Sequence, residues 1–298
     1  MNRFYGTGVA MVTPFQADGQ VDYPGLSGLI NYLTEGGVDY LVSLGTTGES
    51  ATLSKDEKKK VFAFTAEVNN GRLPLVAGIA GNNTYEVVES IKHFDTNGYG
   101  AILSASPHYN KPTQEGIYQH FKAIAEASPL PVILYNVPSR TGSNIAAETT
   151  TRLAHDFKNI IGIKEASGNF DQLNQIFRDK PEDFLVISGD DPISLPMIAL
   201  GAVGVISVVG NALPRQFSDM IRLCLDGNFK GAQKEHFDII EFTRMMFAEG
   251  SPAGVKTALK YLGVCGDTVR LPLVQVSQKL AQRIIVETQR ITAQVAAH

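Results

Sequence analysis

Eight short apolar runs, separated by longer segments with helical periodicity, constrain the fold of this chain more than any other feature of its sequence. The runs are continuously apolar rather than alternating, which is typical of parallel strands covered on both faces. They are VAMVTPF from Val9, YLVSL from Tyr40, LPLVAGI from Leu73, GAILSA from Gly100, PVILYN from Pro131, IIGIK from Ile160, FLVIS from Phe184 and GVISVV from Gly204. Eight strands with interleaved helices predict an α/β fold, a (β/α)8 TIM barrel, and a doubly wound open sheet is the alternative.

Local signals predict where several of the intervening helices begin and end. Ser54 and Glu57 form an S-x-x-E capping box, which predicts a helix that runs to about Asn69. Glycine-rich breaks just before expected strands predict left-handed helix ends at Gly36-Gly37, Gly98 and Gly201.

The pattern changes near residue 228, beyond which only helical segments remain. We therefore expect residues 1–227 to form the barrel and residues 228–298 to form a C-terminal helical extension packed on it. Ser251-Pro252 predicts one helix start in this extension, with the serine as N-cap and the proline at the first helical position.

Charge and cysteine usage exclude several classes of partner. The net charge of −4 and the pI of about 5.9 give no basic surface for nucleic acid or an anionic membrane. The opening MNRFYG has no apolar run typical of a signal peptide. Cys224 and Cys265 lie far apart without a CxxC spacing, which favours free thiols in the cytoplasm over one disulfide. Because Gly6-Thr7-Gly8 precedes the first expected strand and no P-loop occurs, no nucleotide cofactor is expected.

Reactive side chains gather where the expected strands end. In a barrel of this type the residues past the C-terminal strand ends converge on one mouth. They are Thr46 and Thr47 in GTTGES, Tyr109 in SPHYN, Tyr135 and Arg140 in YNVPSRTG, Lys164, Gly189-Asp190-Asp191, and Ile206. A lysine, two tyrosines, two threonines and an arginine at one mouth indicate an enzyme.

Lys164 is the expected centre of that chemistry. Burial disfavours a charged amine, so a lysine that emerges from an apolar strand can become a nucleophile that forms an imine. The alternative is a lysine that extends its charge to solvent at the strand end. Tyr135, one strand away, suits the role of acid and base for the imine, with Thr47 and Tyr109 relaying its proton. A rim tyrosine with a hydrated hydroxyl is the alternative for each aromatic residue.

Two features of the mouth suit carboxylates. Backbone N–H groups of the glycine-bracketed Thr46-Thr47 turn can hold a small carboxylate, since such turns form anion-binding nests. Arg140, in a loop stiffened by Pro138, can clamp a second carboxylate in a bidentate manner, and a surface arginine is the alternative. Asp190-Asp191 is interpreted as a structural loop, because no metal-ligand spacing accompanies it and no metal is expected.

Five motifs in order resemble the dihydrodipicolinate synthase/N-acetylneuraminate lyase family. They are GTTGES at 45–50, SPHYN at 106–110, YNVPSRTG at 135–142, GIKEASG at 162–168 and SGDD at 188–191, and VRLPL at 269–273 extends the likeness to the C-terminal region. The likeness covers essentially the whole chain and is closest to the synthase branch. It implies condensation of pyruvate with L-aspartate 4-semialdehyde, in lysine and diaminopimelate biosynthesis, without a metal or nucleotide.

The resemblance also implies a role for each matching residue. Lys164 matches the Schiff-base lysine and Tyr135 the proton donor and acceptor. Thr47 and Tyr109 match the proton relay, with Tyr109 reaching into a neighbouring subunit. Thr46, Thr47 and the main chain at Ile206 match the pyruvate contacts, and Arg140 matches the clamp for the semialdehyde carboxylate. The family is usually a homotetramer built as a dimer of dimers.

Alternatives remain open at this stage. A class I lyase that cleaves a 2-keto-sugar acid, such as N-acetylneuraminate, could use the same lysine and tyrosine. Sugar-acid lyases resemble one another in lacking an arginine in this loop, so Arg140 favours the semialdehyde. A non-catalytic regulatory barrel is disfavoured, because drift would be expected to break the set formed by Thr47, Tyr109, Tyr135 and Lys164.

Feedback inhibition by lysine is a further hypothesis. The positions that match a lysine-binding site in sensitive family members are Ser50, Ala51, Asn82, Glu86 and His108. Glu86 could pair with the ammonium group of the ligand. Lys55 and Lys58, where some sensitive enzymes have histidines, would instead repel a cationic effector.

Overall fold

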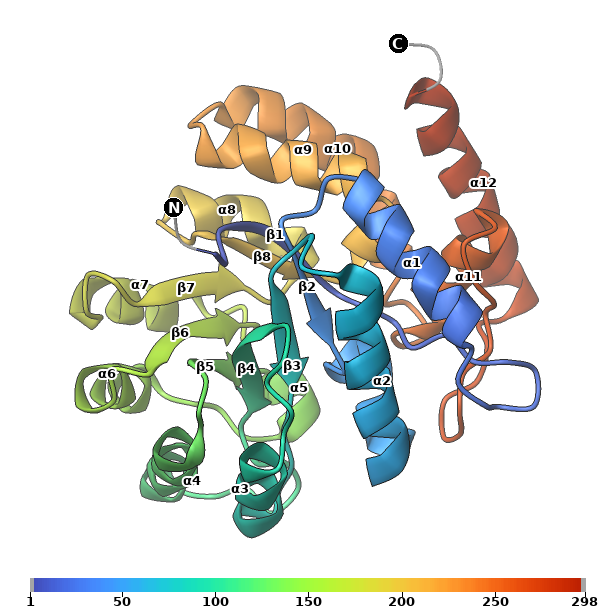
Figure 1. Ribbon diagram of the computed structural model, residues 1–298. Coiled ribbons are helices and arrows are strands. Elements are labelled where there is room, and N and C mark those ends of the chain that lie inside the picture. Colours follow the sequence, from blue (N-terminus) through green and yellow to red (C-terminus); the bar gives the residue numbers. More distant parts are fainter. Residues whose placement is uncertain (1–2, 296–298) are drawn as a thin grey trace.

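The computed structural model describes residues 3–295 and shows a closed barrel of parallel strands in sequence order (Figure 1). The strands are β1 (Gly6–Ala10), β2 (Tyr40–Ser43), β3 (Leu75–Gly78), β4 (Tyr99–Ala105), β5 (Val132–Asn136), β6 (Ile160–Glu165), β7 (Leu185–Ser188) and β8 (Gly204–Ser207). Because β1 pairs with both β2 and β8, the sheet closes on itself. The predicted barrel is confirmed, and the open-sheet alternative is wrong.

Helices surround the barrel and follow the strands in alternation (Figure 1). They are α1 (Tyr23–Glu35), α2 (Lys55–Asn69), α3 (Thr84–Lys92), α4 (Gln114–Ala127), α5 (Pro138–Thr141), α6 (Ala147–Asp156), α7 (Phe170–Asp179), α8 (Ser194–Ala199), α9 (Pro214–Leu225), α10 (Phe229–Met245), α11 (Ala253–Tyr261) and α12 (Gln278–Val295). Short 3-10 turns are η1 (Thr46–Gly48), η2 (Ser50–Thr52), η3 (Asp191–Ile193) and η4 (Val209–Asn211). The predicted capping box is present at the start of α2, which ends at Asn69 as expected.

The start of β1 differs from the prediction. The strand begins at Gly6 rather than Val9, so the Gly6-Thr7-Gly8 segment lies inside it. A Cβ atom on Gly8 would lie 2.2 Å from the Tyr40 ring, and one on Gly6 would lie 2.2 Å from the Asp39 carboxylate. Glycine is therefore required here by close packing between β1 and its neighbour, a constraint that an apolar pattern does not reveal.

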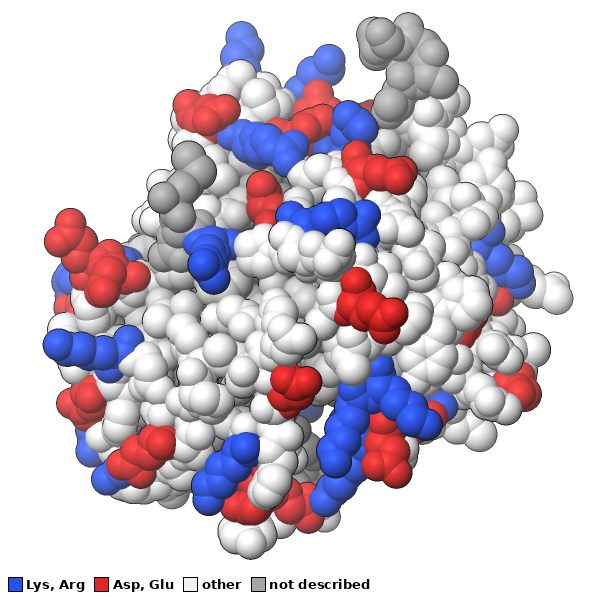
Figure 2. Space-filling model, viewed as in Figure 1, with Lys and Arg blue, Asp and Glu red and all other residues white. Residues whose placement is uncertain are grey.

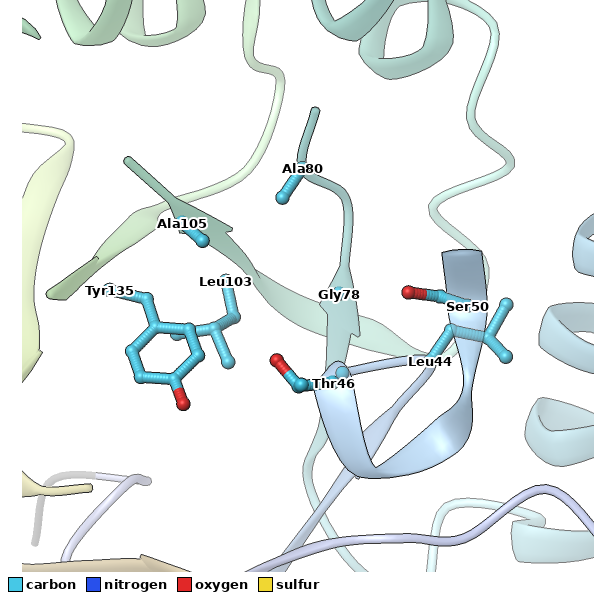
Figure 3. A pocket seen from close by; sticks show the side chains of 9 residues that line it. Leu44, Thr46, Ser50, Gly78, Ala80, Leu103, Ala105 and Tyr135 are labelled. Atoms are coloured by element: carbon cyan, nitrogen blue, oxygen red, sulfur yellow. The ribbon is translucent and has the colours of Figure 1, made fainter. Parts of the chain in front are cut away.

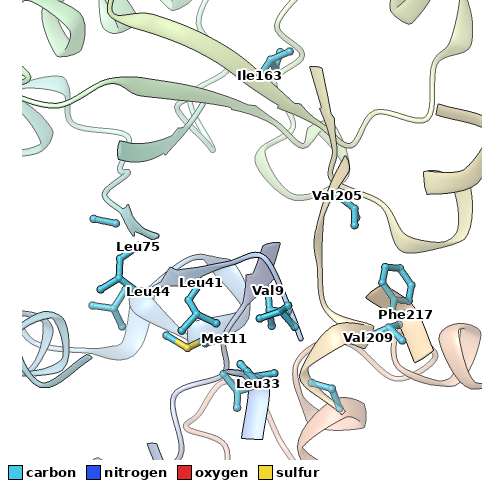
Figure 4. Close-up of a cluster of buried hydrophobic side chains, with 14 of the residues drawn as sticks. Val9, Met11, Leu33, Leu41, Leu44, Leu75, Ile163, Val205, Val209 and Phe217 are labelled. Carbon is cyan, nitrogen blue, oxygen red and sulfur yellow. The ribbon is translucent and has the colours of Figure 1, made fainter. Parts of the chain in front are cut away.

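The hydrophobic core has two layers. An inner cluster fills the barrel itself and includes Tyr40, Leu103, Ile133, Ile187 and Ile206. A larger outer cluster lies between the strands and the helices, and Figure 4 shows part of it around Val9, Leu41, Val205 and Phe217. Burial on both faces of each strand explains why the strand sequences are continuously apolar.

The C-terminal region packs onto the barrel as helices. α10 lies against α9 and α8, and α12 lies against α10 and α11 (Figure 1). α11 begins at Ala253 with Pro252 as the N-cap residue, one position later than the Ser251-Pro252 pattern predicts. The boundary at residue 227 stays a prediction, and residues 296–298 of the expected extension lie outside the described residues.

The surface carries mixed charge on the face in Figure 2, where basic side chains gather over the start of α2, the part with the run Lys55–Lys60. Most of this run is exposed, as expected for a solvated helix face. Between Arg3 and Val295, no helix is long and apolar enough to cross a membrane.

An ion pair at the start of α2 predicts a pH effect on stability. Hydrogen bonds from Arg270, the largest influence, lower the pKa of Glu57 from 4.5 to about 2. Since the folded pKa lies below the unfolded one, this stabilisation is present above pH 4.5 and is lost as the pH falls toward 2. Glu57→Gln should therefore lower the melting temperature at neutral pH, and the difference from the wild type should shrink steadily below pH 4.5.

Thermal melts of both proteins between neutral pH and pH 2 would check this expectation. Glutamine can still complete the capping box with Ser54, so the substitution removes the charge and spares the cap. A difference in melting temperature that does not change with pH would contradict the ionic origin of the effect.

Candidate active site

Lys164 and Tyr135 are direct neighbours at the C-terminal end of the barrel. The register of the strands pairs Ala105 on β4 with Tyr135 on β5, Tyr135 with Lys164 on β6, and Lys164 with Ile187 on β7. Tyr135 and Ile187 both belong to the inner cluster. Paired residues of parallel strands point to the same face, so Lys164 also points into the barrel.

The amine of Lys164 is buried beside an aromatic ring. The side chain is 4% exposed, and its Nζ lies 4.4 Å from the centre of the Tyr135 ring. Among residues 3–295 no carboxylate forms an ion pair with it. A Cβ atom on Gly189, just after β7, would lie 2.8 Å from Ala166 Cβ and 3.0 Å from Lys164 Cε, so glycine leaves room for the lysine stem. A buried amine without a counter-ion is the arrangement that an imine-forming lysine requires.

The Thr46-Thr47 turn lies opposite Tyr135. Thr46 and Tyr135 line the same small cavity of about 50 Å³, and Figure 3 shows both side chains directed into it. Thr47 is buried in η1, and neither its hydroxyl nor that of Tyr135 has a protein hydrogen-bond partner in the described part of the chain. These hydroxyls are therefore available to a bound molecule.

The turn is held close to β3 by glycine. A Cβ atom on Gly78 would lie 2.4 Å from the carbonyl oxygen of Leu44, so only glycine permits this approach. Inside the turn, Gly48 N–H donates to the Gly45 carbonyl at 3.0 Å and Glu49 N–H donates to the Thr46 carbonyl at 3.1 Å. The Thr13 hydroxyl, in the segment that follows β1, donates to the Gly48 carbonyl at 2.7 Å and fixes the turn.

Asp191 holds the backbone that follows β8. One carboxylate oxygen of Asp191 accepts hydrogen bonds from the N–H groups of Val208 and Val209 at 3.0 and 2.9 Å. These bonds clamp the chain just after Ile206, which is buried in β8. Burial raises the pKa of Asp191 to about 6 and raises that of Asp190, on which Lys164 acts in the opposite direction. No group of metal-ligating side chains occurs between residues 3 and 295, and the structural-loop interpretation stays a prediction that the two backbone hydrogen bonds to Asp191 support.

The structure does not bring Tyr109 and Arg140 into the same contact network as Lys164. Tyr109 is 85% exposed, with a backbone φ of 74° and its N–H donating to the Thr141 carbonyl at 3.2 Å. Arg140 is exposed on α5, the short helix that Pro138 opens. Among residues 3–295, neither side chain forms a hydrogen bond with Tyr135 or Thr47.

A buried polar network behind the mouth was not predicted from the sequence. Glu165 and Asn136 follow Lys164 and Tyr135 directly, and their side chains point away from the barrel interior. The Asn136 amide donates to Glu165 at 2.9 Å, and Gln172 donates to the same oxygen at 3.1 Å. Ser167 N–H donates to the other Glu165 oxygen at 2.6 Å. The network joins the ends of β5 and β6. In the sequence, its one indication was that Asn136 and Glu165 each directly follow a predicted reactive residue.

The residues expected to bind lysine differ in their exposure and surroundings. Ser50 lines the cavity shared by Thr46 and Tyr135 (Figure 3). Ala51, Asn82, Glu86 and His108 are exposed, and within residues 3–295 no basic side chain forms an ion pair with Glu86. Burial and the neighbouring Lys55 lower the pKa of Lys58.

The chain is similar to known proteins over nearly its whole length. The model of the dihydrodipicolinate synthetase family matches residues 3–290. A 4-hydroxy-tetrahydrodipicolinate synthase from Flavobacterium psychrophilum is 56% identical over 98% of this chain and 100% of its own. The crystal structure of dihydrodipicolinate synthase from Aquifex aeolicus is 40% identical, with a TM-score of 0.93 over 97% of this chain and 98% of that one. The lysine-bound enzyme from Cyanidioschyzon merolae is 37% identical, with a TM-score of 0.93 over 98% and 99%.

Proposed function

The chain belongs to the dihydrodipicolinate synthetase family, and from this premise we propose that it condenses pyruvate with L-aspartate 4-semialdehyde through a Schiff base on Lys164. As a member of this family, the protein is an enzyme of the class I aldolase type that acts in lysine and diaminopimelate biosynthesis. The observation that carries the assignment of the lysine is the burial of Lys164 beside Tyr135, without an ion-pair partner among the described residues.

The neighbouring groups account for each proton. Lys164 Nζ attacks C2 of pyruvate, and Tyr135 protonates the hydroxyl of the carbinolamine so that it leaves as water. Tyr135, now deprotonated, takes a proton from C3 to give an enamine, whose C3 forms a carbon–carbon bond with the aldehyde carbon of the semialdehyde. Tyr135 returns that proton to the aldehyde oxygen, which becomes a hydroxyl, and then takes one from the ammonium group of the bound intermediate. The amino group of the semialdehyde then displaces Lys164 from C2, which closes the ring and regenerates the lysine. The balance is one water released per product, with no oxidant or reductant.

The pyruvate carboxylate fits the Thr46-Thr47 turn. The N–H groups of Gly48 and Glu49 already donate hydrogen bonds within the turn. The carboxylate would therefore bind to the N–H and hydroxyl groups of Thr46 and Thr47. The main chain at Ile206 completes the pyruvate contacts from β8, and Asp191 holds the residues that follow this strand.

Trapping with sodium borohydride tests the proposal directly. The protein is incubated with pyruvate, reduced, digested and analysed by peptide mass spectrometry. A pyruvyl adduct on Lys164 is expected. Absence of any adduct on the folded protein would overturn the mechanism and leave only the fold.

Arg140 is the proposed clamp for the carboxylate of the semialdehyde, which selects this substrate over a sugar acid. Arg140→Met should lower kcat/KM for the semialdehyde about 10- to 100-fold, because a charge-assisted bidentate contact is lost. KM for pyruvate should stay unchanged. Steady-state kinetics with each substrate varied in turn would measure both effects.

Arg178→Met is the matched control, since Arg178 is an exposed arginine on α7 whose ion-pair partner among residues 3–295 is the surface residue Asp179. This variant should retain the activity of the wild type. If Arg140→Met behaves like the control, or if the wild type releases pyruvate from 2-keto-sugar acids, the semialdehyde assignment is overturned.

Tyr109 is proposed to complete the proton relay in a neighbouring subunit. Its side chain is 85% exposed and has no described partner within its own chain, which fits a residue that acts across an interface. We propose a homotetramer built as a dimer of dimers. Tyr109→Phe should lower kcat at least tenfold without changing the oligomeric state.

Mixing provides the decisive measurement for Tyr109. Subunits carrying Tyr109→Phe and subunits carrying Lys164→Met should regain part of the activity when they are reassembled together, because one mixed site then has both native residues. Failure to regain activity in mixed oligomers confirmed by mass spectrometry would show that Tyr109 acts within its own chain.

Lysine is proposed as an inhibitor that binds near Ser50, Ala51, Asn82, Glu86 and His108. The exposed carboxylate of Glu86 supports it, and Lys55 and Lys58 oppose it by repulsion. The titration of activity with L-lysine decides between them: an unchanged rate at saturating lysine would end the hypothesis.

The free thiols of Cys224 and Cys265 support our inference of a cytoplasmic location.

A further inference from the structure

A buried ion pair connects the Thr46-Thr47 turn to the C-terminal region. Glu49, the last residue of GTTGE, accepts a hydrogen bond from Lys256 Nζ on α11 at 2.6 Å. The two side chains are 1% and 0% exposed. The other oxygen of Glu49 accepts from the N–H of Arg270 at 3.0 Å, and Lys256 also donates to the Thr268 carbonyl at 2.8 Å. The pair is therefore desolvated, and each of its members forms one further hydrogen bond.

The turn that this pair holds has a backbone conformation that few residues adopt. Leu44 and Glu49, at its two ends, have φ angles of 56° and 52°, in the left-handed region that favours glycine. Such conformations persist only where the surroundings over-determine them. At Glu49 the surroundings are the side-chain contacts with Lys256 and Arg270, which come from the other end of the sequence.

Stability alone is a weak reason for an ion pair at this position. Lys256 Nζ lies 4.3 Å from the centre of the Phe15 ring, and burial lowers the pKa of Lys256 while Glu49 acts in the opposite direction. Two apolar side chains of similar volume often stabilise a protein as well as a buried ion pair does. An ion pair differs in its directionality, because its hydrogen bonds fix the position of the groups that carry it.

We propose that Glu49 and Lys256 are positioning residues for pyruvate. Their ion pair holds the Thr46-Thr47 turn in the geometry that receives the pyruvate carboxylate, so α11 supports the active site from outside the barrel. The role in pyruvate binding rests on the proposed function. The role in holding the turn rests on the contacts alone.

The test compares Lys256→Met with the neutral double variant Glu49→Gln/Lys256→Met. The single variant leaves the Glu49 carboxylate without its counter-ion, whereas the double variant removes both charges. If the single variant does not fold, the double variant, which leaves no unpaired buried charge, still allows the measurement. In both, KM for pyruvate should rise about tenfold or more, because a displaced binding group costs affinity, and KM for the semialdehyde should stay unchanged. Lys256→Arg should restore most of the affinity for pyruvate.

Lys260→Met is the matched control. Lys260 lies one helical turn further along α11 and pairs with Asp267 at the surface. Its removal should leave both KM values unchanged. Hydrogen exchange, followed by mass spectrometry of peptides covering residues 44–52, should be at least about tenfold faster in the double variant than in the control.

The outcomes separate the inference from the function. Normal exchange in residues 44–52 together with a normal KM for pyruvate in the folded double variant would overturn the inference. Equal increases in both KM values would show a general structural defect and would also overturn it. If the wild type forms no pyruvate adduct, the proposed function fails instead, and the exchange rates still decide whether the ion pair holds the turn.

Discussion

Replacing Lys164 with methionine should lower the rate of condensation at least about 10³-fold, because the amine that forms the imine is gone. Methionine has a similar length and fills the space above Gly189 that the lysine stem occupies. Borohydride reduction in the presence of pyruvate should then give no adduct at this position. Kinetics and mass spectrometry on the same preparation would measure both effects.

The stability of this variant is equally informative. The Lys164 amine is buried without an ion-pair partner among the described residues, an arrangement that costs free energy in the folded state. The melting temperature of Lys164→Met should therefore equal or exceed that of the wild type, as is common where function is built at the expense of stability.

Lys158→Met is the control for this variant. Lys158 is exposed in the turn that leads into β6, and its replacement should affect neither trapping nor turnover. A Lys164→Met protein that is folded and still condenses the two substrates at a rate near that of the wild type would overturn the Schiff-base mechanism.

Removing only the hydroxyl of Tyr135 should lower kcat about 10²- to 10⁴-fold, the usual contribution of a general acid or base. Tyr135→Phe keeps the ring that packs in the inner cluster next to Lys164, so the fold and the position of the lysine should be unchanged. The adduct with pyruvate should still form, but slowly, because the carbinolamine lacks its proton donor. The time course of borohydride trapping would show this delay.

Tyr40→Phe is the matched control for Tyr135→Phe. Tyr40 belongs to the same inner cluster but lies at the first residue of β2, where its hydroxyl donates to the Val205 carbonyl at 3.4 Å. Loss of the Tyr40 hydroxyl should lower the free energy of unfolding by about 1 kcal/mol or less and leave kcat unchanged. Equal kinetic effects of the two substitutions would assign the loss at Tyr135 to packing rather than to proton transfer.

Much of the site was predictable because a barrel mouth follows from strand order. Once eight strands were recognised, the position of Lys164 and Tyr135 at neighbouring strand ends followed from parallel pairing in sequence order. The capping box of Ser54 and Glu57 was predictable for a similar reason, since its partners lie three residues apart and its hydrogen bonds are local.

The sequence by itself thus determined the barrel, the order of its strands and the placement of Tyr135 and Lys164 at neighbouring strand ends. Those features depend on periodicity, capping and strand order, which are properties of short segments. The tertiary structure alone decided that Gly6 and Gly8 lie inside β1, and that Glu49 meets Lys256 across 207 positions. Both depend on which distant side chain fills the adjacent space. Packing and the pairing of buried charges determine which distant side chain lies there, and a local sequence pattern does not predict it.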